Sequence, residues 1–391
     1  MGAVSEAPVA RQRGVAVLGS TGSIGTTALR VLERQSARFR VAALTSYNNG
    51  SLLGEQAAAF KPRFVGMVGN GTGDMANGAH ADWHHGAECL VQAASRADVD
   101  IVINAVVGAA GLDATIAALE HGKRVALANK ETLVMAGDLV AQACARGGGE
   151  IVPVDSEHSA ILQCITGRPG VEVKRVILTA SGGPFREWPA ERLASATAAD
   201  ALRHPTWQMG RKITVDSATL ANKALEVIEA HFLFGLPYDA IEVVVHPQSI
   251  VHSFVEFVDG SVLAQLGVPS MELPVLYALT HPDRVADSGI PRFDPVAASP
   301  LTFEPVRTSQ FPALGLGIQA GRQGGAAPAV FNAANEEAVA LFLAGRISFA
   351  QIAEAIEQAL GALSGAASST RDELLAADRG ARDFVRGVVA C

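Results

Sequence analysis

GVAVLGSTGSIG, residues 14–25, couples a short apolar run to three glycines spaced GxxGxxG, and a helical stretch follows from about Thr26. The apolar run predicts a β-strand, and the glycines predict a tight turn into the helix. Glycines at such a turn let the backbone approach a pyrophosphate, while the helix N-terminus offers unpaired N–H groups. Because the spacing differs from GxGxxG, an ordinary strand-to-helix turn remains the alternative to a dinucleotide-binding loop.

Beyond this turn, strand-like and helical stretches alternate up to about residue 154. The alternation predicts βαβ units, and therefore an α/β domain over residues 1–154 with a Rossmann-like, doubly wound, mostly parallel sheet. After the second strand of such a domain, NAD enzymes usually carry an acidic residue and NADP enzymes often carry Arg or Lys. The sequence here is Tyr47-Asn48-Asn49, which leaves the choice between the two cofactors open.

Three further regions differ from the first in composition. Residues 155–285 alternate strands with loops such as SGGPF and RHPTWQMG, which predicts a central α+β catalytic domain with its metal and substrate site on loops. Within it, Asp259-Gly260 predicts the two-residue turn of a hairpin between residues 251–258 and 261–267. Residues 286–312 contain five prolines and predict an extended connector. Residues 313–391 are rich in Ala and Leu and predict a C-terminal helical bundle, most plainly at 329–343 and 349–363.

The composition excludes several classes of function. The 391 residues carry a formal net charge of -8, which argues against a nucleic-acid-binding surface. Four widely spaced cysteines include no CxxC pair, so neither a zinc site nor a disulfide framework is indicated. The N-terminal residues lack the apolar core of a signal peptide, and no apolar run approaches the roughly 20 residues of a membrane span. We therefore expect a cytoplasmic protein that binds neither nucleic acid nor membranes.

Two acidic residues follow a predicted strand in Asp155-Ser156-Glu157. If the strand continued, alternation would place Asp155 and Glu157 on one side, where hard carboxylate oxygens could share a Mg²⁺ or Mn²⁺ ion. Two solvated carboxylates at a strand end are the simpler alternative.

A second polar group lies in residues 216–226, DSATLANKALE, where a helix is expected to begin near Asp216 or Ser217. Asn222, Lys223 and Glu226 would share one face, because residues three or four apart are neighbours on a helix. Lys223 suits a phosphate, and Glu226 could be a third metal ligand. An ordinary capped and solvated helix is the alternative.

Taken together, the motifs of this sequence resemble those of the 1-deoxy-D-xylulose 5-phosphate reductoisomerase family over nearly the whole chain. Nine of them occur in the family's order: GSTGSIG, VVGAAGL, LANKETLV, PVDSEHSAI, TASGGPFRE, RHPTWQMGRKITVDSATLANKALEVIEA, VHPQSIVHS, DGSVLAQLG and FNAANEEAVALF. Nine collinear motifs make a chance resemblance implausible.

The resemblance implies a role for each matching residue. For NADPH, it implies contacts by Thr21, Gly22, Ser23, Ile24, Tyr47, Asn48, Asn49, Asn129, Glu131 and Gly210. For the divalent metal, Mg²⁺ or Mn²⁺ with Co²⁺ as a third option, it implies Asp155, Glu157 and Glu226. For the substrate, it implies Lys130, Ser156, Glu157, Ser181, His204, Trp207, Ser217, Asn222, Lys223 and Glu226, with Ser181, Ser217, Asn222 and Lys223 at its phosphate. Lys130, Glu157 and His204 are expected to be catalytic, and His204, Trp207 and Met209 lie on the family's mobile loop.

The resemblance also implies the reaction. The expected activity is the NADPH-dependent rearrangement and reduction of 1-deoxy-D-xylulose 5-phosphate to 2-C-methyl-D-erythritol 4-phosphate by a homodimer. One departure concerns Tyr47-Asn48-Asn49, where the family commonly has a cation for the 2′-phosphate of NADPH. Two alternatives are a related enzyme for another phosphorylated sugar or a homoserine-dehydrogenase-like aldehyde, and a dinucleotide sensor without catalysis. An intact set of metal-ligand residues argues against the sensor.

Overall fold

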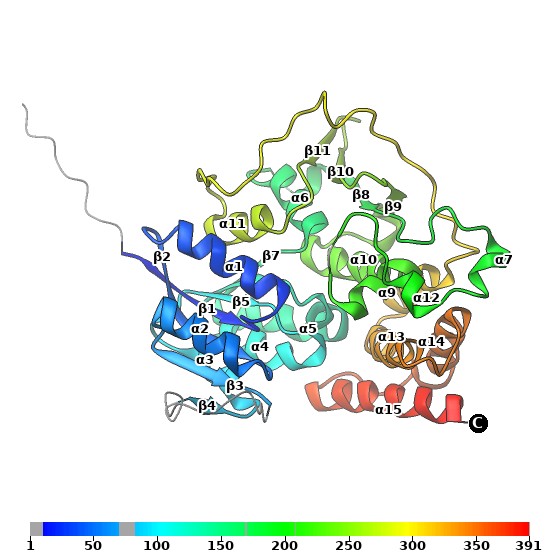
Figure 1. Ribbon diagram of the computed structural model, residues 1–391, viewed down its shortest axis with the longest axis horizontal. Helices are drawn as coiled ribbons and strands as arrows, with labels where there is room; N and C mark the ends of the chain where they lie inside the picture. Colours follow the sequence, from blue (N-terminus) through cyan, green and yellow to red (C-terminus); the bar gives the residue numbers. More distant parts are fainter. Residues whose placement is uncertain (1–10, 70–82, 169, 208, 391) are drawn as a thin grey trace, which may run out of the picture.

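The computed structural model describes residues 11–69, 83–168, 170–207 and 209–390 (Figure 1). Its larger sheet has seven strands: β1 (Arg13–Leu18), β2 (Phe39–Ser46), β3 (Phe64–Met67), β4 (His84–His85), β5 (Ile101–Asn104), β6 (Arg124–Leu127) and β7 (Glu150–Pro153). All are parallel, in the order β4-β3-β2-β1-β5-β6-β7. The strand order reverses at β1, and in such sheets ligands bind outside the carboxyl ends of the strands at that point.

Helices cover both faces of this sheet: α1 (Ser23–Arg34), α2 (Gly50–Phe60), α3 (Glu88–Ser95), α4 (Leu112–Glu120), α5 (Lys130–Gly147) and α11 (Glu272–Thr280). Along β1, Val15 and Val17 pack in one cluster with α1 and α11, whereas Ala16 and Leu18 pack in another with α3, α4 and α5. The predicted doubly wound parallel sheet is thus confirmed. Helix α1 begins at Ser23, earlier than the predicted Thr26, so Ser23 and Ile24 lie in its first turn. The sequence pattern did not predict α2 or α3, because the α2 segment contains two glycines and its apolar periodicity is weak.

The smaller sheet consists of β8 (Val173–Ala180), β9 (Ile241–Val245), β10 (Val251–Phe257) and β11 (Val262–Leu266), in the order β11-β10-β8-β9. Helices α6 (Ser156–Ile165) and α10 (Ala221–Phe234) contribute to the apolar cluster on this sheet. The predicted hairpin between β10 and β11 is confirmed, but its loop is one residue longer than predicted. Phe257 N–H donates to Ser261 O, and Gly260, at φ +84°, donates to Phe257 O, as in a type I turn followed by a left-handed glycine.

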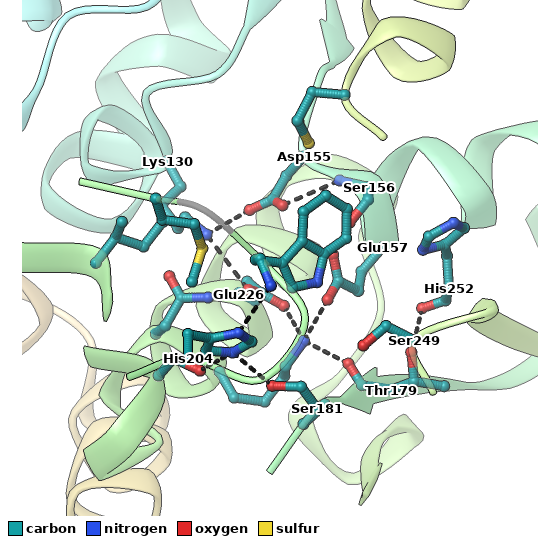
Figure 2. A pocket seen from close by; sticks show the side chains of 18 of the residues that line it. Lys130, Asp155, Ser156, Glu157, Thr179, Ser181, His204, Glu226, Ser249 and His252 are labelled. Atoms are coloured by element: carbon teal, nitrogen blue, oxygen red, sulfur yellow. Dashed lines mark hydrogen bonds and ion pairs between the residues drawn. The ribbon is translucent and has the colours of Figure 1, made fainter. Parts of the chain in front are cut away.

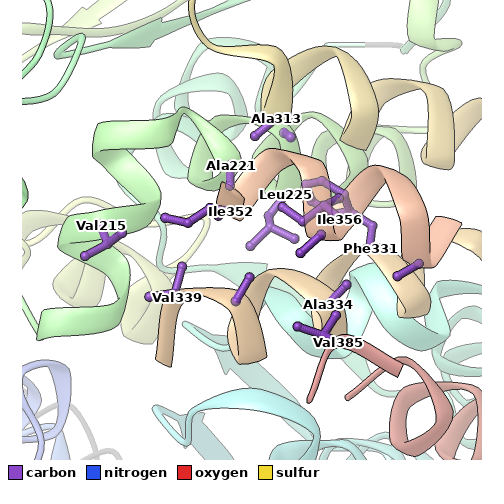
Figure 3. Close-up of a cluster of buried hydrophobic side chains, with 14 of the residues drawn as sticks. Val215, Ala221, Leu225, Ala313, Phe331, Ala334, Val339, Ile352, Ile356 and Val385 are labelled. Atoms are coloured by element: carbon purple, nitrogen blue, oxygen red, sulfur yellow. The ribbon is translucent and has the colours of Figure 1, made fainter. Parts of the chain in front are cut away.

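The remaining helices are α7 (Ala190–Leu193), α8 (Ala198–Ala201), α9 (Arg211–Thr219), α12 (Pro312–Gln323), α13 (Ala327–Leu343), α14 (Phe349–Leu363) and α15 (Arg371–Ala390). Between α11 and α12 the described chain forms no helix or strand, only a bridge from Glu304 to Val245, and it runs past the smaller sheet (Figure 1). Helices α12 to α15 form the predicted C-terminal helical region. Figure 3 shows that its core is continuous with Val215 of α9 and Leu225 of α10. Helices α9 and α10 therefore connect the C-terminal helices to the smaller sheet.

Candidate active site

One cavity lies between the carboxyl ends of the larger sheet and the smaller sheet (Figure 2). Its walls come from α1, the first turns of α5, α6 and α10, the end of β8 and the loop before α9. Fourteen residues predicted from the sequence line it: Ser23, Ile24, Lys130, Asp155, Ser156, Glu157, Ser181, His204, Trp207, Gly210, Ser217, Asn222, Lys223 and Glu226. The seven other predicted residues lie outside its lining: Thr21, Gly22, Tyr47, Asn48, Asn49, Asn129 and Glu131.

The three predicted metal ligands come together. Asp155, Glu157 and Glu226 each offer a carboxylate oxygen within 4.8 Å of the others. The predicted cause was wrong for the first two, because the strand ends at Pro153 and they do not alternate along it. Asp155 instead caps α6, accepting a hydrogen bond from Ser156 N–H at 3.0 Å, and Glu157 lies in the first turn. The close oxygens fit a divalent cation such as Mg²⁺, which prefers this kind of ligand.

Two buried lysines neutralise these carboxylates. Lys130, in the first turn of α5, donates to Asp155 and lies 3.3 Å from Glu226. Lys223 donates to Glu157 at 2.8 Å, to Glu226, and to the carbonyl oxygen of Thr179 at 2.5 Å. Because the side chains of Lys130 and Lys223 are only 7% and 5% exposed, these contacts replace most of their hydration.

The pKa values of the three carboxyl groups are shifted in different directions. Burial by itself would raise the pKa of Asp155 and of Glu157, but Lys130 beside the first and Lys223 beside the second lower both. Burial, with the nearby charge of Glu157, raises the pKa of Glu226 to about 7. The site thus combines two strongly ionised carboxylates with a third that is held less firmly in its charged form.

Asn222, Lys223 and Glu226 lie on one face of α10, as predicted, and Asn222 donates to Glu226. The predicted single helix from Asp216 was wrong, because Leu220 adopts a left-handed conformation, φ +62°, and separates α9 from α10. Ser217 therefore lies near the end of α9 rather than at a helix start. Asn222 and Lys223 point toward the carboxylates in this structure, apart from the hydroxyl groups with which the sequence grouped them.

A second polar group surrounds His204, in the loop before α9 (Figure 2). Its Nε2 lies 2.9 Å from Ser181 Oγ and 3.2 Å from Ser217 Oγ. Its Nδ1 accepts a hydrogen bond from Trp207 N–H at 2.9 Å, so the proton of the neutral ring is on Nε2. Burial lowers the pKa of His204 to about 4. The ring is thus a neutral donor that points, with two hydroxyls, into the cavity.

A pair of glycines lets the loop after β8 approach α9. Gly183 has φ +66°, and a Cβ there would lie only 2.6 Å from Ser217 O. Any larger residue would push Ser181 away from Ser217, because the atom it would meet belongs to the backbone of Ser217. The SGGPF motif therefore creates the close approach of the two serines.

The dinucleotide loop faces the same cavity through Ser23 and Ile24. Gly25 is required for the turn, since a Cβ there would lie 2.2 Å from Gly19 O. Thr21 Oγ1 lies 2.7 Å from Ser46 Oγ at the end of β2, which joins this loop to the neighbouring strand. The turn therefore leaves the N-terminus of α1 open beside the cavity.

The predicted cofactor residues outside the cavity lining contact other residues of the chain or are exposed to solvent. Tyr47 is 69% exposed, and Asn49 caps α2 by accepting a hydrogen bond from Leu52 N–H. Asn129 donates to the carbonyl oxygens of residues 106 and 108 and accepts from Thr132, so its amide holds the loop after β5. Glu131 lies 3.5 Å from Lys212.

Sequence reasoning did not assign several residues that line the cavity. Ser249 and His252 come from the VHPQSIVHS motif, and Met271 precedes α11. A histidine within the valine- and phenylalanine-rich stretch VHSFVEF of β10 is a sequence signal that could have identified His252, which is buried in the structure. Ser249 adopts a positive φ of 52°, which no local pattern indicates.

A second group of possible metal ligands overlaps the first and consists of Asp155, His158 and Glu229. His158 Nδ1 pairs with Glu229 at 3.0 Å, and its Nε2 lies 2.8 Å from the carbonyl oxygen of Glu226. Both ring nitrogens are therefore engaged, which favours the three carboxylates as the metal site.

Within the described residues, no helix has the length and apolar character needed to cross a bilayer.

Comparison with known proteins identifies the family. Three family models match: 1-deoxy-D-xylulose 5-phosphate reductoisomerase at residues 15–137, its C-terminal domain at 151–234, and the DXP reductoisomerase C-terminal domain at 266–384. The reductoisomerase of Gloeobacter violaceus is 49% identical over 382 residues, covering 96% of this chain and 97% of that protein. That of Chloroherpeton thalassium is 50% identical over 375 residues, covering 95% and 97%.

Solved structures agree. The Zymomonas mobilis reductoisomerase in complex with NADPH has a TM-score of 0.90 and 41% identity, covering 97% of this chain and 99% of that one. A DOX-P reductoisomerase in complex with NADPH, fosmidomycin and magnesium has a TM-score of 0.89 and 37% identity, covering 97% and 98%. The chain belongs to the 1-deoxy-D-xylulose 5-phosphate reductoisomerase family.

Proposed function

We propose that this chain converts 1-deoxy-D-xylulose 5-phosphate to 2-C-methyl-D-erythritol 4-phosphate with NADPH and a divalent metal ion, as its family does. One observation carries the proposal. A carboxylate trio, a hydroxyl and imidazole group and the dinucleotide loop all line a single cavity. A metal, a phosphorylated sugar and a nicotinamide cofactor could therefore be held next to one another.

Asp155, Glu157 and Glu226 would hold the metal, because their oxygens converge within 4.8 Å. An ion bound there supplies a Lewis acid for the ketone and neighbouring hydroxyl oxygens of the substrate. Lys130 lies beside Asp155 and Glu226. From there its ammonium would face the negative charge that develops on the ketone and hydroxyl oxygens of the substrate. Ser156 donates to Glu157 and holds that carboxylate in place. We therefore propose that Lys130 and Glu157 act at the reacting carbons.

Ser181, His204 and Ser217 would hold the phosphate. The hydroxyl oxygens of Ser181 and Ser217 lie 2.9 Å and 3.2 Å from His204 Nε2. Hydroxyl and N–H donors suit phosphate oxygens. Asn222 and Lys223 line the same cavity and contact the carboxylates in this structure, and we propose that they turn to the phosphate when the substrate binds. Because the His204 proton is on Nε2, we propose that this N–H donates to the substrate's phosphate, and the catalytic role expected for His204 stays a prediction. Trp207 would close the loop over the substrate and exclude water.

NADPH would bind with its pyrophosphate at the N-terminus of α1, where Thr21, Gly22, Ser23 and Ile24 lie, and would supply the hydride. Gly210 also lines the cavity. Tyr47, Asn48 and Asn49 follow β2, where the adenosine ribose of a dinucleotide is expected. None of these three is a cation, and the NADPH preference would then rest on the absence of an acidic residue.

We also propose a homodimer located in the cytoplasm. Strand β11 is an edge strand, and its Val262, Leu263 and Leu266 are 50%, 39% and 38% exposed. Exposed apolar edges favour pairing with a second strand. Light scattering that gave the mass of a monomer would contradict the dimer. We further propose that the domains comprise residues 1–154, 155–285 and 313–391, with residues 286–312 as the connector.

The test follows absorbance at 340 nm with 1-deoxy-D-xylulose 5-phosphate, Mg²⁺ or Mn²⁺, and NADPH or NADH. We expect metal-dependent oxidation of NADPH that stops when EDTA is added. Matched variants are Asp155→Asn, which should lose activity, and Glu150→Gln at the exposed far end of β7, which should retain it. Folded wild-type protein that binds dinucleotide but oxidises neither cofactor would contradict the proposal.

A further inference from the structure

Helix α9 rests on a polar cluster that the proposed reaction does not use. We call it the α9 anchor: Lys212 and Asp216 of α9, with Asn335 and Glu336 of α13. Asn335 Nδ2 donates to Asp216 Oδ1 at 2.8 Å, and Lys212 Nζ lies 2.9 Å from Asp216 Oδ2. Glu336 lies 3.8 Å from Lys212 and accepts from Arg382 of α15 at 2.7 Å.

The position of the α9 anchor within an apolar core is energetically costly. Asn335 is 0% exposed and Asp216 only 1%, and the residues that precede them in the chain, Ala334 and Val215, belong to the apolar core drawn in Figure 3. A buried polar group is costly unless it is hydrogen-bonded. The FNAANEE motif therefore requires an explanation beyond packing.

The α9 anchor fixes the part of α9 that faces the cavity. Both oxygens of Asp216 are held, one from α13 and the other from the preceding turn of α9. The next residue is Ser217, whose hydroxyl lies 3.2 Å from His204 Nε2. A rotation of α9 that released Asp216 would move Ser217 away from His204.

The α9 anchor also lies at the C-terminal end of the loop that carries His204 and Trp207. Lys212 is the second residue of α9, directly after this loop ends at Gly210. Its ammonium lies 3.5 Å from Glu131, the neighbour of Lys130. The end of the loop is thus tied to α5 on one side and to α13 on the other.

We propose that Asn335 and Lys212 are positioning residues that set Ser217 and the end of the His204 loop for the substrate's phosphate. This inference rests on the proposed function, because it deepens the role of the phosphate group. It assigns a task to the C-terminal helices, none of whose described residues lines the cavity.

The test compares Asn335→Leu, which keeps the size of the side chain but removes its donor, with Arg386→Met. Arg386 joins α15 to Glu337 of α13 at 2.7 Å, so it supports the same helix pair without touching the α9 anchor. For Asn335→Leu we expect KM for 1-deoxy-D-xylulose 5-phosphate to rise roughly tenfold, since a hydrogen bond to a buried charged acceptor is lost. The value of kcat should fall less than about threefold, and the Kd for NADPH should not change. Arg386→Met should leave all three constants unchanged.

Binding of inorganic phosphate, measured by calorimetry, gives a readout that does not depend on turnover. We expect Asn335→Leu to weaken it in parallel with the rise in KM, and Lys212→Arg, which keeps the charge, to weaken it less than Lys212→Met. If Asn335→Leu does not fold by circular dichroism, Glu336→Gln tests the same cluster. An unchanged KM and phosphate affinity in a folded variant would overturn the inference, as would an equal effect of Arg386→Met. An inactive wild-type protein that binds phosphate would instead contradict the proposed function.

Discussion

Lys223→Met would test whether the carboxylates depend on this lysine for charge compensation. The ammonium contacts Glu157 and Glu226, whose side chains are 16% and 1% exposed, and methionine keeps the length of the side chain without its charge. Removing one partner of a buried ion pair typically costs about 3–5 kcal/mol, because a charge is left without compensation. At about 2 °C per kcal/mol for a protein of this size, the melting temperature in EDTA should fall by roughly 6–10 °C.

Mg²⁺ provides the sharper part of this experiment. A divalent cation bound by the same carboxylates would replace the lost positive charge, so Mg²⁺ should stabilise Lys223→Met more than it stabilises the wild type. Melting is followed by calorimetry at constant ionic strength, with and without EDTA. Lys174→Met is the control, because Lys174 pairs with Glu256 at 2.8 Å but is 59% exposed, and such pairs contribute about 0–1 kcal/mol. A loss below 1 °C in EDTA, or equal stabilisation of both proteins by Mg²⁺, would refute the reasoning.

Three further predictions follow from the site. Asp155→Asn should weaken Mg²⁺ binding and lower kcat/KM by roughly 100-fold or more, measured by titrating the metal in the 340 nm assay. His204 should make the loop sensitive to acid: burial lowers its pKa from 6.5 to about 4, so the folded loop disfavours the proton. Its stabilising contribution is complete above about pH 6.5 and is lost as the pH falls toward 4, so Trp207 fluorescence should change in that window and not in His204→Asn. Asn48→Arg should lower KM for NADPH and not for NADH, because it adds a cation where the 2′-phosphate is expected, and an equal change for both cofactors would contradict this placement.

The sequence predicted much of the fold because its signals are local. The parallel sheet follows from strand and helix alternation, and the hairpin at Asp259-Gly260 follows from turn chemistry. The break at Leu220 could not be predicted, since a leucine at positive φ is stabilised by its surroundings and not by its own preference. That break determines the direction of Asn222, Lys223 and Glu226, so the orientation of the site was not readable from a single helix pattern.

The metal ligands were predicted partly for a wrong reason. Alternation along a strand was expected to align Asp155 with Glu157, whereas Asp155 is a helix cap and Glu157 lies in the following turn. An acidic or hydroxyl residue followed by a helical stretch is a known start signal, and it would have predicted α6 correctly. The same two residues are brought together in spite of this error, because both arrangements leave two carboxylates at the carboxyl end of one strand.

The charges of the site explain why local patterns could not predict its assembly. Lys130 and Glu226 are 96 residues apart and come from α5 and α10, yet each is almost fully buried and each is a partner of the other. Each side chain also has a second partner, Asp155 for Lys130 and Lys223 for Glu226, so their contact joins two ion pairs that would otherwise be buried with unbalanced neighbours. The contact therefore forms only when the larger sheet, α6 and α10 are all docked. Docking of the sheet and formation of the catalytic cluster are in this sense a single event, and a substitution in the cluster should affect stability and activity together.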